Sequence, residues 1–205
     1  MKSAVVAALA GLSFTTAWAA GPNLVVNGSF EADLIPLNSW SIRPTITGWV
    51  GAPDIELQHD LEGNVAQDGV QLVELDTFYN SAMSQTLNAS GLVELSFWFK
   101  PRIGWGAGTQ GIEVSLGSFS SVVMDTATGI GPTPAWQRFS TQVDLGSSGS
   151  AVLRFAAVGT SDMAGGLIDN VSVTAVSAVP EPSTAALALA GGLGWVAWQR
   201  RRRPG

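Results

Sequence analysis

Residues 93–100 read Val-Glu-Leu-Ser-Phe-Trp-Phe-Lys, and this stretch decides the fold class of the chain. Its odd-numbered positions are all apolar, whereas its even-numbered positions carry two charged residues, a serine and Trp98. Side chains alternate between the two faces of a β-strand, so a period of two is typical of a strand with one buried face. The stretch therefore predicts a half-buried strand with Trp98 on its polar face.

Similar short runs, rich in β-branched and aromatic residues, recur between Gly, Pro, Asn and Asp breaks. Besides 93–100, these runs are residues 24–26, 46–50, 55–58, 70–75, 82–87, 112–116, 120–124, 137–143, 151–157 and 168–176. No segment between residues 21 and 179 combines a helical repeat with helix caps. Many short strands without helices predict an all-β domain, a jelly-roll β-sandwich.

The C-terminal segment, residues 178–205, has three parts. They are Pro180, Glu181 and Pro182, then the uncharged residues 184–198, then the four arginines Arg200, Arg201, Arg202 and Arg203. The prolines disfavour helix and leave the stretch before residue 183 extended. A helix over 184–198 would span roughly 22 Å, short of the ~30 Å hydrocarbon core. The arginines favour a cytoplasmic end, so we expect a short membrane helix with the bulk of the chain outside.

This order of parts closely resembles the PEP-CTERM sorting signal of exported bacterial proteins. The resemblance implies recognition by an exosortase, a membrane enzyme that removes the tail and passes the protein to the cell surface or the extracellular matrix. It also implies a transient anchor in the inner membrane and a place beside polysaccharide synthesis, which favours an exopolysaccharide ligand. The alternatives are a C-terminal anchor that is never cut, or a tail with no role in a membrane.

The other end of the chain predicts export as well. Residues 1–19 carry Lys2, an apolar run and small residues near Ala19, the pattern of a secretory signal helix cleaved after Ala19 and handled by the secretion machinery. The domain between the two ends, residues 20–177, keeps 5 of the 10 basic and 15 of the 16 acidic residues, a net charge near −10. Such a surface does not attract nucleic acid, so we expect no partner of that kind. The chain has no cysteine, which excludes disulfides and thiolate metal sites.

Three fragments carry a second resemblance. They are residues 23–31 (NLVVNGSFE), 134–139 (PAWQRF) and 167–173 (LIDNVSV). Their order and spacing resemble the galactose-binding-like β-sandwich of several carbohydrate-binding module families. In related sandwiches a structural calcium ion lies where the first strand meets the last, and the matching positions here are Glu31 and Asp169. The alternative is that these two carboxylates cap turns and bond backbone amides.

Sugar binding needs an aromatic face beside polar groups, because apolar sugar faces stack on rings and hydroxyls need hydrogen-bonding partners. The candidate contacts are Trp98 on the polar face of its strand, Trp105 in a Gly-rich loop beside Arg102, and Tyr79 in a polar loop. The alternative is that the tryptophans are buried, as is common in sandwiches.

Catalysis is not expected from this sequence. Asp54 and Glu56, like Glu74 and Asp76, are two residues apart, but such acidic pairs are ordinary on a solvated strand face of an acidic chain. The single histidine, His59, has no Gly-x-Ser-x-Gly nucleophile elbow to serve. We therefore expect a non-catalytic, exported protein that binds carbohydrate or exopolysaccharide. The alternative is a structural or adhesive matrix protein that acts through protein contacts or self-association.

Overall fold

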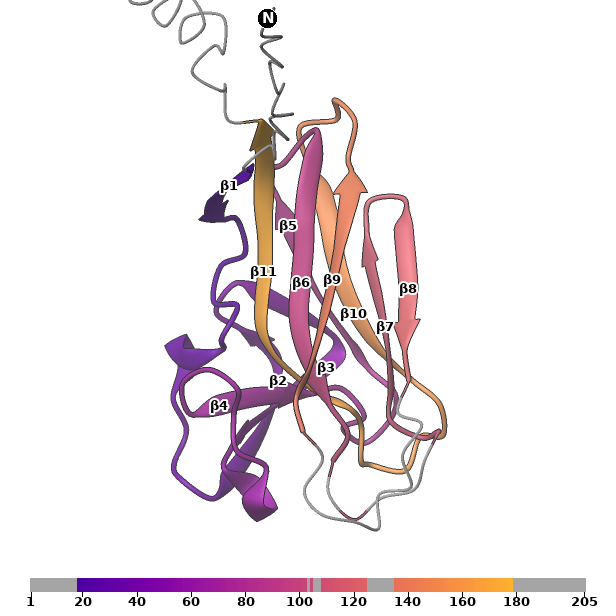
Figure 1. The fold of residues 1–205 in the computed structure, drawn as a ribbon. Coiled ribbons are helices and arrows are strands. Elements are labelled where there is room, and N and C mark those ends of the chain that lie inside the picture. The colour runs from indigo at the N-terminus through magenta and orange to yellow at the C-terminus, as the bar shows by residue number, and fades with distance from the viewer. Residues whose placement is uncertain (1–17, 103, 105–107, 125–134, 179–205) are drawn as a thin grey trace, which may run out of the picture. The chain divides into compact units, whose positions relative to one another are not determined.

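The computed structural model describes residues 18–102, 104, 108–124 and 135–178 (Figure 1). Most of the predicted signal peptide, the predicted membrane helix over 184–198, the tail motif and Trp105 lie outside these ranges. The strands are β1 (Trp18–Asn23), β2 (Ser39–Ile46), β3 (Trp49–His59), β4 (Gln71–Glu74), β5 (Ala82–Leu87), β6 (Leu92–Lys100), β7 (Gly111–Leu116), β8 (Phe119–Val123), β9 (Gln137–Asp144), β10 (Ala151–Val158) and β11 (Leu167–Ala178). Two short 3-10 helices, η1 (Glu31–Asp33) and η2 (Leu61–Gly63), interrupt them. Within the described ranges, no helix has both the length and the apolarity needed to cross a bilayer.

The strands follow one path, β8-β7-β10-β5-β3-β4-β11-β6-β9, with β1 beside β11 and β2 beside β3. Strand β3 joins the two halves of this path, because its first part pairs with β5 and its last part pairs with β4. Phe97 of β6 meets Phe155 of β10 with ring centroids 5.0 Å apart, although these strands do not pair. The sheet therefore folds onto itself, which confirms the predicted all-β sandwich (Figure 1).

The core lies between the two layers and is apolar. The apolar face of residues 93–100 is buried as predicted, with Val93, Leu95 and Phe97 fully inaccessible. Phe155 also contacts Trp49, at a ring distance of 6.1 Å, and Trp49 in turn contacts Phe30 at 5.9 Å. Each such side chain contributes roughly 1.5–3 kcal/mol when it leaves water, so this aromatic row is a main source of stability.

The first strand differs from the prediction of a strand over 24–26. The observed strand β1 ends at Asn23, and it includes the last two residues of the predicted signal peptide. The side chain of Asn23 supplies hydrogen bonds that a neighbouring strand would otherwise make. Its Oδ1 accepts the N–H groups of Val25 and Val173, each at 3.0 Å. The N–H of Val26 donates to Gln85 Oε1 at 2.8 Å. One backbone bond remains, from the N–H of Leu24 to the carbonyl oxygen of Val173 at 2.8 Å, and side chains replace the rest of the predicted ladder.

The expected strand over 46–50 is also divided. Its two halves belong to β2 and β3, which form a hairpin that turns at Thr47 and Gly48. Gly48 has φ = 83°, a conformation that L side chains rarely adopt. The N–H of Thr47 donates to Asp33 Oδ2 at 2.7 Å, which fixes the turn. The hairpin brings β2 alongside β3 and so prepares one wall of the pocket described next.

Candidate functional site

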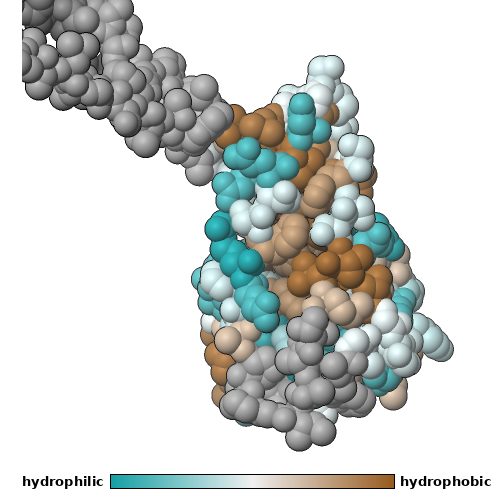
Figure 2. Space-filling model, turned by 45° about the vertical axis from the view of Figure 1, so that its right-hand side comes forward, coloured by the Kyte–Doolittle hydropathy of each residue, from teal (hydrophilic) through white to brown (hydrophobic). Residues whose placement is uncertain are grey.

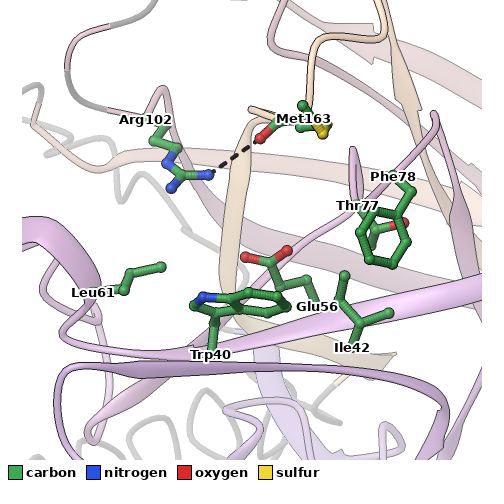
Figure 3. A pocket seen from close by; sticks show the side chains of 8 residues that line it. All are labelled: Trp40, Ile42, Glu56, Leu61, Thr77, Phe78, Arg102 and Met163. Atoms are coloured by element: carbon green, nitrogen blue, oxygen red, sulfur yellow. Dashed lines mark hydrogen bonds between the residues drawn. The ribbon is translucent and has the colours of Figure 1, made fainter.

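A pocket of about 230 Å³ opens beside β2 and β3 (Figure 3). Its lining side chains come from β2, β3, η2 and three connecting segments: Trp40, Ile42, Leu61, Glu56, Thr77, Phe78, Arg102 and Met163. Trp40 and Ile42 are two residues apart on β2, and Ile42 is paired with Glu56, so all three share one face of the sheet. In Figure 3 the Glu56 carboxylate lies among the other side chains, with the Trp40 ring beside it.

The rim of the pocket is aromatic and exposed. Trp40 is 53% exposed and Phe78 is 57% exposed, while Tyr79, the next residue in the chain, is 69% exposed. Among the side chains that the structure describes, these are the only aromatic residues with more than half their surface in water. The hydrophobic effect disfavours such exposure, and amphipathic rings at a pocket edge are well suited to stack on a ligand.

The sheet face on the far side of the sandwich is different. Figure 2 shows the side of β7 and β8, where apolar side chains gather in the middle and polar ones lie mostly toward the edges. Its exposed apolar residues include Val122 and Val152, of β8 and β10. No described side chain of β5, β7, β8 or β10 is an aromatic ring with more than half its surface exposed. This face therefore offers no broad stacking platform.

Behind the pocket, two glutamates face each other across β3 and β4. Glu56 is paired with Glu74, and both side chains are buried. The amide of Gln58 bridges them, because its Nε2 donates to Glu56 Oε1 at 2.8 Å and to Glu74 Oε2 at 2.7 Å. A buried carboxylate without such partners would be strongly unfavourable, so the amide is part of what holds the pair together.

Arg102 is the positive charge of this cluster. Its Nη1 donates to Glu74 Oε2 at 2.9 Å, and its Nη2 donates to Glu62 Oε2 at 3.1 Å. A further bond runs from Nη1 to the carbonyl oxygen of Met163 at 3.4 Å, drawn as a dashed line in Figure 3. Glu74 also accepts the N–H of Gly165 at 2.6 Å. The guanidinium therefore links the pocket wall to the segment before β11.

The electrostatics of the pair follow from this burial. Desolvation first, and then the charge of Glu56, raise the pKa of Glu74 to about 8, against the opposing effect of Arg102. Desolvation also raises the pKa of Glu56, although the bond from Gln58 and the charge of Arg102 work against it. The pair therefore keeps a proton at neutral pH, because two adjacent buried carboxylates do not both ionise easily.

Asp76 positions the segment that carries Met163. Its Oδ2 accepts the N–H groups of Asp162 at 2.8 Å and Ala164 at 3.4 Å. Its Oδ1 accepts the hydroxyl of Ser161 at 3.1 Å. These bonds hold residues 161–164 in place across the pocket wall, and the buried Asp76 side chain is a structural element of the site rather than one of its lining groups.

The sequence-predicted sugar contacts are not all brought together. Arg102 lines the pocket, and Tyr79 follows the pocket residue Phe78. Trp98 is half-buried on β6, paired with Arg138 of β9 and Asp169 of β11, and is not among the residues that line the pocket. Trp105 lies outside the described residues. The exposed Trp40, which lines the pocket, was not among the four predicted contacts.

Trp40 and Glu56, two residues that line this pocket, had weaker signals in the sequence. Trp40 and Ile42 alternate with serines and Arg43, a period of two that would have placed Trp40 on the face of a strand. Glu56 was visible only as one of a pair of acidic residues. Its partner across the sheet is Glu74, not the neighbouring Asp54, and such pairing between distant residues is not written in local spacing.

Glu31 and Asp169, the predicted calcium ligands, hold the same loop. Glu31 Oε1 accepts the N–H groups of Val70 and Gln71 at 2.9 and 2.7 Å. Asp169 Oδ2 accepts those of residues 67 and 68 at 2.7 and 2.9 Å. In the part of the chain that the structure describes, no three Asp, Glu, His or Cys side chains gather where they could hold a metal ion. The two carboxylates bond backbone amides, and the calcium site that they would form stays a sequence-based prediction.

Residues 178–203 match the family model of the PEP-CTERM protein-sorting motif. The chain ends in a sorting signal. This match confirms the resemblance that the proline pair, the apolar run and the arginines had indicated. No curated protein matches the chain.

Several solved structures are similar to this chain. TmCBM61 in complex with beta-1,4-galactotriose has a TM-score of 0.49 and 18% identity, over 75% of this chain and 98% of that one. The Family 16 Carbohydrate Binding Module-2 has a TM-score of 0.46 and 14% identity, over 74% and 99%. The enzymatically active domain of tailspike protein 4 of bacteriophage CBA120 has a TM-score of 0.44 and 15% identity, over 76% and 21%. At these TM-scores and identities, nothing about a ligand of this chain follows from the likeness.

Proposed function

We propose that this chain is an exported, non-catalytic protein of the cell envelope or extracellular matrix that binds carbohydrate in the pocket beside β2 and β3. The observation that carries the proposal is the exposed indole of Trp40 next to the buried polar groups of Glu56 and Arg102 in a single hollow. A sugar presents an apolar face and a ring of hydroxyls, and this hollow offers a partner for each.

In this proposal the roles of the side chains differ. The Trp40 ring stacks on the apolar face of a sugar, and Phe78 and Tyr79 extend the rim. The carboxylate of Glu56 bonds the hydroxyls, and the guanidinium of Arg102 holds Glu74 and Glu62 beside it. Because both polar side chains are already held by neighbours, little side-chain freedom is lost on binding, which favours affinity.

The pocket is proposed to bind a sugar without hydrolysing it. A glycosidase places two carboxyl groups on either side of the scissile bond. Here Glu56 lines the pocket, but its partner Glu74 has no exposed surface and bonds Gln58, Arg102 and Gly165. A carboxyl group engaged in this way is not free to attack or protonate a sugar.

Delivery follows from the sorting motif at residues 178–203. We expect the secretion machinery to export the chain, the apolar segment to anchor it in the inner membrane, and an exosortase to remove the tail. The roles of Pro180, Glu181, Pro182 and the four terminal arginines in this step remain those that the resemblance implies.

A glycan array probed with the full chain tests the proposal. We expect binding to at least one polysaccharide fragment, and the W40A variant is expected to lose it while melting at an unchanged temperature, since Trp40 is exposed. V152A, which changes an exposed residue of β10, is the control and keeps binding. W98A examines the second platform that the sequence predicts.

Two results would contradict the proposal. If a folded W40A variant still bound the glycan, this pocket would not be the binding site. If only W98A lost glycan binding, the site would lie on β6 instead. An array without any bound glycan, together with oligomers that grow with concentration, would favour the structural or adhesive alternative.

A further inference from the structure

The surroundings of the pocket carry an excess of negative charge. Four carboxylates, Glu56, Glu62, Glu74 and Asp76, act on one another there, and Asp162 interacts with Asp76. In the part of the chain that the structure describes, Arg102 is the one cation that lines the pocket. Even with one proton on the glutamate pair, the carboxylates outnumber the guanidinium.

The guanidinium of Arg102 is moreover already paired with two carboxylates. One arm of its guanidinium bonds the buried Glu74 and the other bonds Glu62, at 2.9 and 3.1 Å. An anionic sugar such as a uronate could reach this cation only by displacing Glu62, while facing the charge of Glu56. The pocket therefore disfavours anions.

We propose that the preferred ligand is a cationic carbohydrate, one whose pyranose unit bears a free amino group, with its ammonium beside Glu56. This inference rests on the proposed function and names the class of sugar for the same pocket.

A second observation points to a ligand independently of the charges. Thr77 lines the pocket with only 3% of its surface exposed, and its buried hydroxyl has no hydrogen-bond partner among the described residues. A buried hydroxyl without a partner is unfavourable and rare in native proteins. A ligand that brings several N–H or O–H donors, as an amino sugar does, can satisfy it.

The aromatic rim supports the same class of ligand. The faces of tryptophan and phenylalanine rings are negative, so they attract an ammonium group as well as the apolar face of a sugar. Trp40 and Phe78 both line the pocket with more than half their surface exposed. The raised pKa values of Glu56 and Glu74 agree with this inference, because burial raises both and the charge of Glu56 further raises that of Glu74, against the opposing charge of Arg102.

Titration calorimetry with three oligosaccharides of equal length tests the inference: a glucosamine oligomer, its N-acetylated form and a uronate oligomer. At pH 6 and low salt, we expect the full chain to bind the glucosamine oligomer at least about tenfold more tightly than the N-acetylated one, and the uronate oligomer not at all. The preference is expected to shrink as salt rises, since charges near a surface are screened.

Two variants separate this pocket from the overall acidity of the domain. E56Q keeps the shape of the side chain and is expected to bring the affinity ratio of the two glucosamine-based oligomers close to one. E113Q removes a carboxylate on β7 that pairs with Arg154, away from the lining residues, and is expected to leave the ratio unchanged. An equal loss in both variants would mean that only net charge is sensed and would overturn the inference.

The remaining outcomes are also distinct. Equal binding of the amino and N-acetylated oligomers, with no effect of E56Q, overturns the amino-sugar inference and leaves the proposed function standing. If none of the three oligosaccharides binds but another neutral glycan binds on the array, the amino-sugar inference is likewise overturned and the proposed function stands. No glycan bound in either experiment contradicts the proposed function itself. Tight binding of a lysine oligopeptide, without binding of the glucosamine oligomer, assigns the pocket to a cationic peptide and overturns the inference.

Discussion

The two faces of strand β3 are built on opposite principles. Ile55 and Leu57 point into the apolar core, where both are fully buried. Glu56 and Gln58, which alternate with them, belong to the polar cluster and are buried as well. Packing explains the first face completely, because apolar burial stabilises without any need for partners. The second face needs a bridging amide, an arginine and backbone donors to exist at all.

This difference teaches which face is shaped by function. Burying two carboxylates next to each other is unfavourable for stability, and an apolar pair of similar volume would often do as well or better. A sequence that departs from the rules of packing at one place is commonly doing so for a binding or catalytic site. The core face keeps the sandwich folded, and the polar face is the part of the strand that a ligand would need.

The largest effect is expected on the core side. Phe97→Ala removes a fully buried ring that contacts Phe139 and Phe155, and we expect a loss of about 3–5 kcal/mol in the free energy of unfolding. Urea denaturation of the full chain measures it. V152A, at an exposed position, serves as the control and is expected to change stability by less than about 0.5 kcal/mol. A loss as small as that of the control would mean that this side of β6 does not carry the core.

A smaller effect, with a defined pH range, is expected on the polar side. The pKa of Glu74 is raised from 4.5 to about 8, so the folded state holds its proton more tightly than the unfolded state does. The resulting stability is fully present below pH 4.5 and is lost as the pH rises through about 8. The melting temperature should therefore fall across this range, and E74Q should weaken that fall.

Asp169 provides the comparison for that experiment. Burial raises its pKa to about 7, against the bonds from three backbone amides, so it acts in the same direction but over a lower range. D169N should alter the slope only below about pH 7, whereas E74Q should alter it up to about pH 8. A slope that E74Q leaves untouched between pH 7 and 8 would show that the glutamate pair does not hold the proton.

The smallest effect is expected from removing metal. Glu31 and Asp169 bond main-chain amides of residues 67–71, which is the alternative to a calcium site that the sequence leaves open. We expect the same melting temperature with EGTA and with added calcium. A midpoint that falls in EGTA and recovers with calcium would return both carboxylates to the calcium site that the sequence predicts.

Much of the fold could be predicted from local pattern. The strand over 82–87 has the predicted bounds, and those over 93–100 and 112–116 differ by one residue, because alternation within a strand reports its buried face directly. The prediction was wrong at 24–26, where Asn23 and Gln85 supply hydrogen bonds from their side chains. Such bonds depend on residues far apart in the sequence and leave no periodic trace.

The site was less predictable for the same reason. Arg102 was identified beside a Gly-rich loop, but its partners Glu62 and Glu74 lie 40 and 28 residues away. Lys100 shows the limit most clearly. Its place on the polar face of β6 predicts exposure, yet it is only 2% exposed, because Trp136 covers it with the ring centroid 4.9 Å from its Nζ. Alternation assigns a side chain to a face but does not tell what covers that face.

The pairing of β1 with β11 has a consequence for how the protein is displayed. Asn23 holds the last strand through bonds to Val171 and Val173, so the first and last strands of the domain lie side by side. Figure 1 shows the end of β11 at the upper tip of the sandwich, whereas β2 and β4 lie in its lower half. The strand end that leads into the sorting motif therefore lies away from β2, which carries Trp40.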